Sequence, residues 1–118
     1  MDNKLKSKTR LTAIQLLSQH LISHQDIELI KDDFDKYYRN SIIDENLEKV
    51  QYNMNFLSKL ITYFKKIDFK ILSQEINSII KFNRQFENWD NINKSIIIIA
   101  ISEIRNSQNE KTKIILND

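Results

Sequence analysis

Apolar residues recur along most of the chain at steps of three and four, which is the spacing of one face of an α-helix. The pattern predicts helices over residues 7–23 and 26–39, a long helical stretch that ends near residue 80, and a last helix over 92–104. The apolar faces of the first three stretches comprise Ala13, Ile14, Leu17 and Leu21, then Ile27, Ile30 and Phe34, then Val50, Met54, Leu57, Ile61 and Phe64.

Polar residues of the types that begin and interrupt helices set the expected boundaries. The third stretch is either one long helix or two helices with a bend near Lys65 and Lys66. Residues 40–46 and 105–113 are polar enough to predict loops. The expected N-caps are Ser7 or Thr9, Asp26, Asp44, and Asp90 or Asn91.

The run Ile96–Ile99 lies within the most apolar part of the chain. A membrane span needs about 20 apolar residues, and this stretch is shorter, so we expect no membrane segment. β-Branched residues favour strands, but no partner strand is evident. We therefore expect a helix that is buried on most sides, with Trp89 just before it as a core anchor between helices.

The chain of 118 residues contains no glycine, proline or cysteine. Without glycine it has no phosphate-binding loop and no dinucleotide fingerprint, and without cysteine it has no thiol nucleophile or cysteine-based metal site. The net charge of +2 is small but allows a local basic patch. We expect an all-α protein in which residues 1–118 form a single-domain bundle of about five to six helices.

Two segments resemble the NusB family of bacterial transcription antitermination factors. The stretch RLTAIQLLSQHLISHQDI is similar to the family's opening helix. The stretch NWDNINKSIIIIAISEI, followed by KTKIILND, is similar to its Trp and Ile-x-Arg/Lys-x-Ile-Leu helix and to the start of the next helix. The matching residues are Arg10, Ala13, Ile14, Gln15, Leu17, Asp26, Ile27, Trp89, Ile92, Lys94, Ile96, Ile97, Ala100, Glu103, Ile104, Lys113, Ile114, Leu116, Asn117 and, conservatively, Asp118.

The chain also departs from the family pattern. Ile98 stands where the family has an arginine, Ser102 where it has a tyrosine, and Lys111 where it has a proline. Family members continue for roughly one more helical pair, so the resemblance implies a bundle that lacks the family's last helices.

The N-terminal run NKLKSKTR carries four cations near a helix start. Such a run is often a solubilising tail, and the residues alone favour that interpretation. Lys and Arg also neutralise phosphates, and the resemblance reverses the preference because NusB-like proteins hold the single-stranded boxA RNA with this region. The predicted RNA-binding residues are Lys4, Lys6, Lys8, Arg10 and Gln15, with Gln15 reading a base edge.

Other polar clusters do not form a recognisable chemical site. His20 and His24 have the spacing of two metal ligands but lack a third, and Asp32, Asp33 and Asp35 lack the glycine and distal glutamate of a calcium loop. We expect the aspartates to form a hydrated face. Glu103 has no acid–base partner and is expected to be structural, bonded to the following loop or to Asn117. We therefore expect that the protein is not an enzyme and that it has no catalytic residue, no metal and no cofactor.

The resemblance implies a cytoplasmic adaptor that pairs with the ribosomal protein known as NusE. The pair would bind boxA RNA in nascent ribosomal RNA transcripts and act within the RNA polymerase antitermination complex. The alternative is a helical protein-interaction module without an RNA role, such as a detached NusB-like regulatory domain of an RNA methyltransferase. The absence of an apolar leader after the basic start agrees with either hypothesis.

Overall fold

The first helix, α1, spans Asn3–Ser23 in the computed structural model, which describes residues 2–39, 52–80 and 84–117. Its N-cap is Asp2, whose carboxylate accepts a hydrogen bond of 2.7 Å from the backbone N–H of Leu5. The prediction of Ser7 or Thr9 as the cap is wrong, because the helix begins before both residues. An aspartate also complements the positive end of the helix dipole, which the basic run that follows does not.

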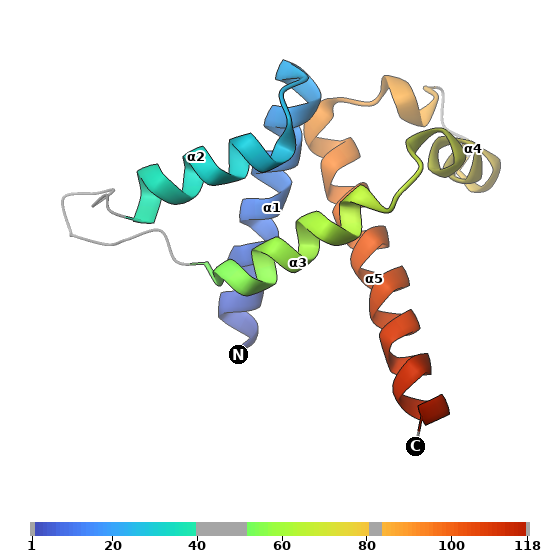
Figure 1. Ribbon diagram of the computed structural model, residues 1–118. Helices are drawn as coiled ribbons and strands as arrows, with labels where there is room; N and C mark the ends of the chain where they lie inside the picture. Colours follow the sequence, from blue (N-terminus) through green and yellow to red (C-terminus); the bar gives the residue numbers. More distant parts are fainter. Residues whose placement is uncertain (1, 40–51, 81–83, 118) are drawn as a thin grey trace.

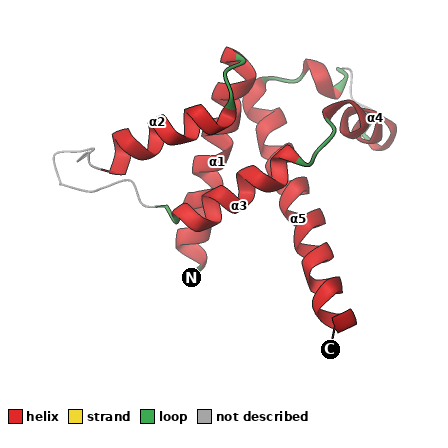
Figure 2. Cartoon of the chain, viewed as in Figure 1, coloured by secondary structure: helices red, strands yellow, loops and turns green. Residues whose placement is uncertain are grey.

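The remaining elements are also helical, which confirms the all-α, single-domain prediction (Figure 2). No strand occurs in the ranges that the structure describes. The predicted loop at 40–46, including the expected cap Asp44, lies outside those ranges. The elements are α2 (Ile27–Arg39), α3 (Met54–Lys65), α4 (Phe69–Ile79), a 3-10 helix η1 (Phe86–Asn88) and α5 (Asn91–Asn117).

The helices α1 and α5 run in opposite directions and contact each other, and α3 crosses both of them (Figure 1). The helix α2 packs on α1, whereas α4 and η1 lie together beside the first half of α5. All five α-helices and η1 contribute to one core. Its buried members are Ala13, Leu16, Leu17, Ile27, Ile30, Leu57, Leu60, Ile61, Tyr63, Leu72, Ile76, Phe86, Ile98 and Ile99.

Side-chain caps define where the later helices begin. The side-chain oxygens of Asn53, Asp68 and Asp90 accept hydrogen bonds from the first turns of α3, α4 and α5. The chain leaves α3 at Lys66 and begins α4 at Phe69, so the third stretch is two helices with a break at the predicted bend. The cap of α3 is Asn53. Where α1 ends, His24 takes the left-handed conformation (φ 59°) that glycine adopts more easily.

The last helix differs from the prediction in length and in burial. It continues through the predicted polar loop at 105–113, because that segment has no glycine or proline to end it. The isoleucine run is helical, but only Ile98 and Ile99 are buried. Ile96 is 42% exposed and Ile97 is half-buried, so the helix buries one face rather than most of its circumference.

The acidic cluster of α2 is not wholly a hydrated face. Asp35 is 8% exposed, and it accepts hydrogen bonds from Lys31 Nζ at 3.1 Å and from Tyr52 Oη at 2.6 Å. Asp32 and Asp33 are exposed, as expected. The buried carboxylate therefore ties α2 to the residues just before α3, and partners on both sides offset the cost of its burial.

The fully buried aromatic before α5 is Phe86 rather than Trp89. The Trp89 ring is half-buried and meets Phe86 edge to face, with 5.1 Å between ring centroids. The side chain of Asn77 accepts a hydrogen bond from the Phe86 backbone N–H and donates one to Glu87. The bond to Asn77 holds the pKa of the Glu87 carboxyl below its usual range. These contacts fix η1 on α4, so Trp89 supports the core from its edge.

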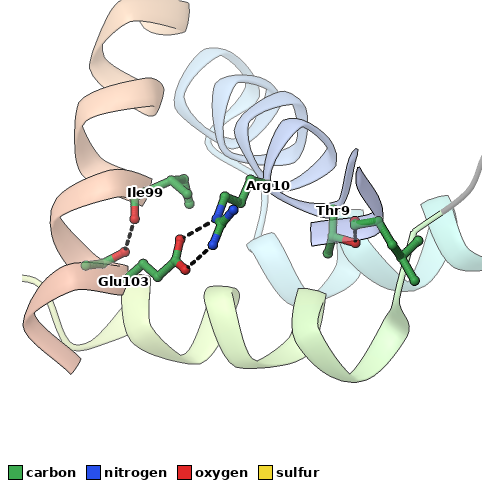
Figure 3. Close-up of polar contacts among 6 residues, drawn as sticks. Thr9, Arg10, Ile99 and Glu103 are labelled. Carbon is green, nitrogen blue, oxygen red and sulfur yellow. Dashed lines mark hydrogen bonds and ion pairs between the residues drawn. The ribbon is translucent and has the colours of Figure 1, made fainter. Parts of the chain in front are cut away.

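A buried hydroxyl joins α1 to the start of α3. Thr9 is fully buried, and its Oγ1 donates to the Leu5 carbonyl at 2.8 Å (Figure 3). The same oxygen accepts from the Asn53 N–H at 2.9 Å. Asn53 in turn caps α3 through its side chain. The residue proposed as a cap for its own helix therefore positions another helix.

Replacing Thr9 with valine keeps the shape of the side chain but leaves the Asn53 N–H without its acceptor. We expect the free energy of unfolding in urea to fall by about 1–2 kcal/mol. Thr62→Val is the matched control, because the exposed Thr62 hydroxyl bonds only a carbonyl of its own helix. It should change stability by no more than about 0.5 kcal/mol. Equal effects of the two changes would contradict the role of the Thr9 hydroxyl in joining α1 to α3.

Candidate functional site

The site begins with an ion pair between α1 and α5. Arg10 Nε and Nη2 donate to the two carboxylate oxygens of Glu103, each at 2.8 Å, across 93 positions of sequence (Figure 3). The bond to Glu103 raises the pKa of the Arg10 guanidinium above its ordinary value, so Arg10 stays charged. The partner of Glu103 in the structure is thus Arg10; the side chain of Asn117, its expected partner, lies outside the described side chains.

An aromatic ring of α3 helps to fix the same guanidinium. The Cζ atom of Arg10 lies 5.5 Å from the ring centroid of Phe56, within the range of a cation–π contact. Phe56 follows the α3 cap by one turn, so the Thr9–Asn53 contact that places α3 also places this ring. Arg10 is thus held by α5 on one side and by α3 on another, while its side chain remains 39% exposed.

A hollow with a volume of about 490 Å³ lies where α1, α3 and α5 meet. We call it the cationic cleft. Three cations and one carboxylate line it, and the carboxylate is already paired with Arg10, so the cleft keeps an excess of positive charge. Its lining residues are Lys6, Arg10, Asn53, Asn55, Phe56, Lys59, Tyr63, Glu103 and Ser107.

The structure divides the five predicted RNA-binding residues between two faces of α1. Lys6 and Arg10 are one helical turn apart and both line the cationic cleft. Lys4, Lys8 and Gln15 follow one another by four and seven positions, so they lie on a second face, turned away from the cleft. Lys4 and Gln15 are exposed and Lys8 is half-buried. The predicted site is therefore two surfaces of one helix.

The α3 part of the cleft was not predicted from the sequence. Asn53 had a local signal, since an asparagine before an apolar helical run is a common N-cap. Asn55, Phe56 and Lys59 had no comparable signal, because nothing in the sequence places residue 59 beside residue 6. Tyr63 is 5% exposed, and the Nζ atom of Lys59 lies 5.8 Å from its ring centroid.

A second hollow, also of about 490 Å³, lies along α1 and α5 on the other side of Arg10. We call it the apolar groove. Its walls are Ile14, Ile96, Ile99, Ala100 and Ile104, and Arg10, Glu103 and Ser107 line both hollows. Ile104 is 56% exposed at its edge. The Arg10–Glu103 pair therefore forms the boundary between a charged cleft and an apolar groove.

Two other site types find no support in the described ranges. No group of three or more His, Asp or Glu side chains there is arranged to hold a metal ion. His20 contacts the Gln25 carbonyl and the Phe64 ring instead. None of the helices in those ranges has both the length and the hydropathy that crossing a bilayer requires.

The Arg10–Glu103 pair should be coupled more strongly than an ordinary surface pair. In a double-mutant cycle with Arg10→Ala and Glu103→Ala, we expect a coupling of about 1 kcal/mol in the free energy of unfolding. The two parallel hydrogen bonds raise this value, and solvent exposure of Arg10 limits it. The control cycle is Glu28→Ala with Lys65→Ala, a single-contact pair whose side chains are both more than 40% exposed. Its coupling should be about 0.3 kcal/mol. An equal value for both pairs would contradict a special role of the Arg10–Glu103 pair in joining α1 to α5.

Comparison of the chain with profiles of known protein families, with curated proteins and with solved structures finds no match.

Proposed function

We propose that the protein is a non-enzymatic RNA-binding adaptor that acts in the cytoplasm in the manner of the NusB family. In this role it pairs with ribosomal protein NusE, binds boxA RNA in nascent ribosomal RNA transcripts and joins the RNA polymerase antitermination complex. The family role rests on the sequence resemblance. RNA binding as such is supported by the surface of α1 and α3.

The observation that carries the proposal is the grouping of Lys6, Arg10 and Lys59 around one cleft. Cations on two different helices converge there although the net charge of the whole chain is only +2. Lys4 and Lys8 extend the positive charge around α1. A strand of RNA that enters the cleft would meet its cations, and the affinity of such contacts falls as salt concentration rises.

The Arg10–Glu103 pair connects the two segments that resemble the NusB family. Arg10 belongs to the first resembling segment and Glu103 to the second. The fold brings these two matched positions into direct contact, and both line the cleft. Ile98 and Ser102, two positions that depart from the family pattern, are fully buried and do not line the cleft.

The apolar groove favours the second candidate, a protein-interaction module without an RNA role. Ile96 and Ile104 are 42% and 56% exposed beside it, and exposed apolar surface of this kind often marks a protein contact. Under the first hypothesis the groove is the surface offered to NusE. Pull-down from cells distinguishes the two, because NusE and antitermination factors support the adaptor and other partners support the module.

Double substitutions that remove two positive charges test whether the cleft binds RNA. We expect Lys6→Gln with Lys59→Gln to weaken binding of labelled boxA RNA and to reduce the slope of log affinity against log salt concentration by about 1.4, which corresponds to two lost phosphate contacts. Lys4→Gln with Lys8→Gln tests the outer face in the same way. Arg10 is left intact, because Arg10→Glu would place two carboxylates together at Glu103.

The matched control is Lys36→Gln with Lys70→Gln, which removes the same charge from exposed positions on α2 and α4. It should leave the salt slope unchanged. Circular dichroism of each variant checks that the helices are retained. If neither the cleft variant nor the outer-face variant differs from the unchanged protein in its salt slope, the proposed RNA-binding surface is wrong.

A purified ribosomal partner tests the adaptor role directly. We expect NusE to raise the affinity of the protein for boxA RNA by at least about tenfold, because the two partially basic surfaces together contact more phosphates than either one alone. Binding is measured by fluorescence anisotropy with and without NusE. Ile104→Asp, at the exposed edge of the groove, should remove the increase but keep the RNA affinity of the isolated protein. An RNA affinity that NusE does not change would contradict the adaptor role.

A further inference from the structure

We propose that the cationic cleft receives one unpaired nucleotide of the RNA, with its base on the guanidinium of Arg10 and its flanking phosphates on Lys6 and Lys59. This inference rests on the proposed RNA-binding function and gives Arg10 a different role within it. Arg10 would then recognise a base rather than neutralise a phosphate.

The geometry of Arg10 suits a stacking platform. Glu103 engages two of the five N–H donors of the guanidinium and fixes its plane, and the ring of Phe56 lies 5.5 Å from its Cζ atom. The carboxylate already compensates the charge, which weakens attraction for a phosphate. The Arg10 side chain remains 39% exposed, and unpaired RNA bases stack on arginine planes.

Lys6 is a better phosphate ligand than Arg10. No carboxylate in the described part of the chain lies within ion-pair distance of Lys6. Lys59 is exposed, and its long side chain reaches over Tyr63. These two ammonium groups come from α1 and α3, with Arg10 also lining the cleft, so phosphates on either side of one nucleotide would each find a cation.

The remaining lining gives the cleft both apolar and hydrogen-bonding walls. Phe56 contributes an aromatic ring, and Asn53 and Asn55 contribute amides, a group that can donate to and accept from a base edge. The volume of about 490 Å³ falls within the range of about 300–1,000 Å³ that is usual for small-ligand pockets. An acidic peptide would use the cations but not the aromatic and amide surfaces, so a nucleotide fits the lining better.

The test separates base recognition from phosphate attraction. The probes are a fluorescein-labelled single-stranded decaribonucleotide of adenosine and uridine and a strand of equal length that carries abasic ribose at every position. We expect the intact protein to bind the strand with bases about tenfold more tightly. Arg10→Lys keeps the charge but removes the plane, so it should weaken binding of that strand severalfold and leave the abasic strand unchanged.

Arg105→Lys is the matched control, because Arg105 forms a comparable pair with Glu75 away from the cleft. It should bind both strands as the unchanged protein does. If Arg10→Lys fails to fold, the unchanged protein still decides the question through the NMR signal of the Arg10 Nε–H group. That signal should shift on addition of the strand with bases and should not shift with the abasic strand.

The outcomes distinguish this inference from the proposed function. Binding that depends on Lys6 and Lys59 but is equal for the two strands would overturn base recognition and leave RNA binding intact. An absence of any lysine-dependent RNA binding would overturn both. Displacement of the RNA by a decaglutamate peptide at equal concentration would assign the cleft to acidic protein segments and would also overturn the inference.

Discussion

The packing of α1 against α5 is the contact on which the other parts of the structure depend. The two helices run in opposite directions, and α3 crosses both, so α3 takes its position from the pair (Figure 1). Ser95 and Ser102 are fully buried on the inner face of α5, and their hydroxyls bond carbonyls of their own helix. Small, internally satisfied side chains allow the helices to meet without an unpaired polar group. Both ends of the sequence therefore contribute to one surface.

A chain without glycine or proline has few ways to end a helix, and this explains what could be predicted. Asp26 and Asp90 lie where apolar spacing begins, and both mark helix starts as expected. The break after Lys65 is one of the two alternatives that the pattern left open. The loop predicted after Ile104 was wrong, because a polar segment indicates a loop only when it also contains a residue that stops helices. Burial around the isoleucine run was overestimated, since periodicity does not reveal how many neighbours a helix has.

The functional surface was predictable only where it is local. The basic run of α1 was visible in the sequence, but its division between two faces became clear only with the helix extended back to Asn3. The ion-pair partner of Arg10 is Glu103, which is 93 positions away. No spacing rule predicts a contact between two residues so far apart in the sequence. Phe56 and Lys59 look like ordinary positions of an amphipathic helix. They line the cationic cleft because Thr9 holds the start of α3 beside α1.

The position of Arg10 between two hollows has a consequence for how they respond to ligands. A ligand in the apolar groove that drew Glu103 toward itself would also change the orientation of the guanidinium that lines the cleft, because both side chains line both hollows. Such an effect would be thermodynamically reciprocal, so each ligand would alter the affinity of the other by the same factor. Cooperativity of this kind would need only the two side chains of one ion pair to move.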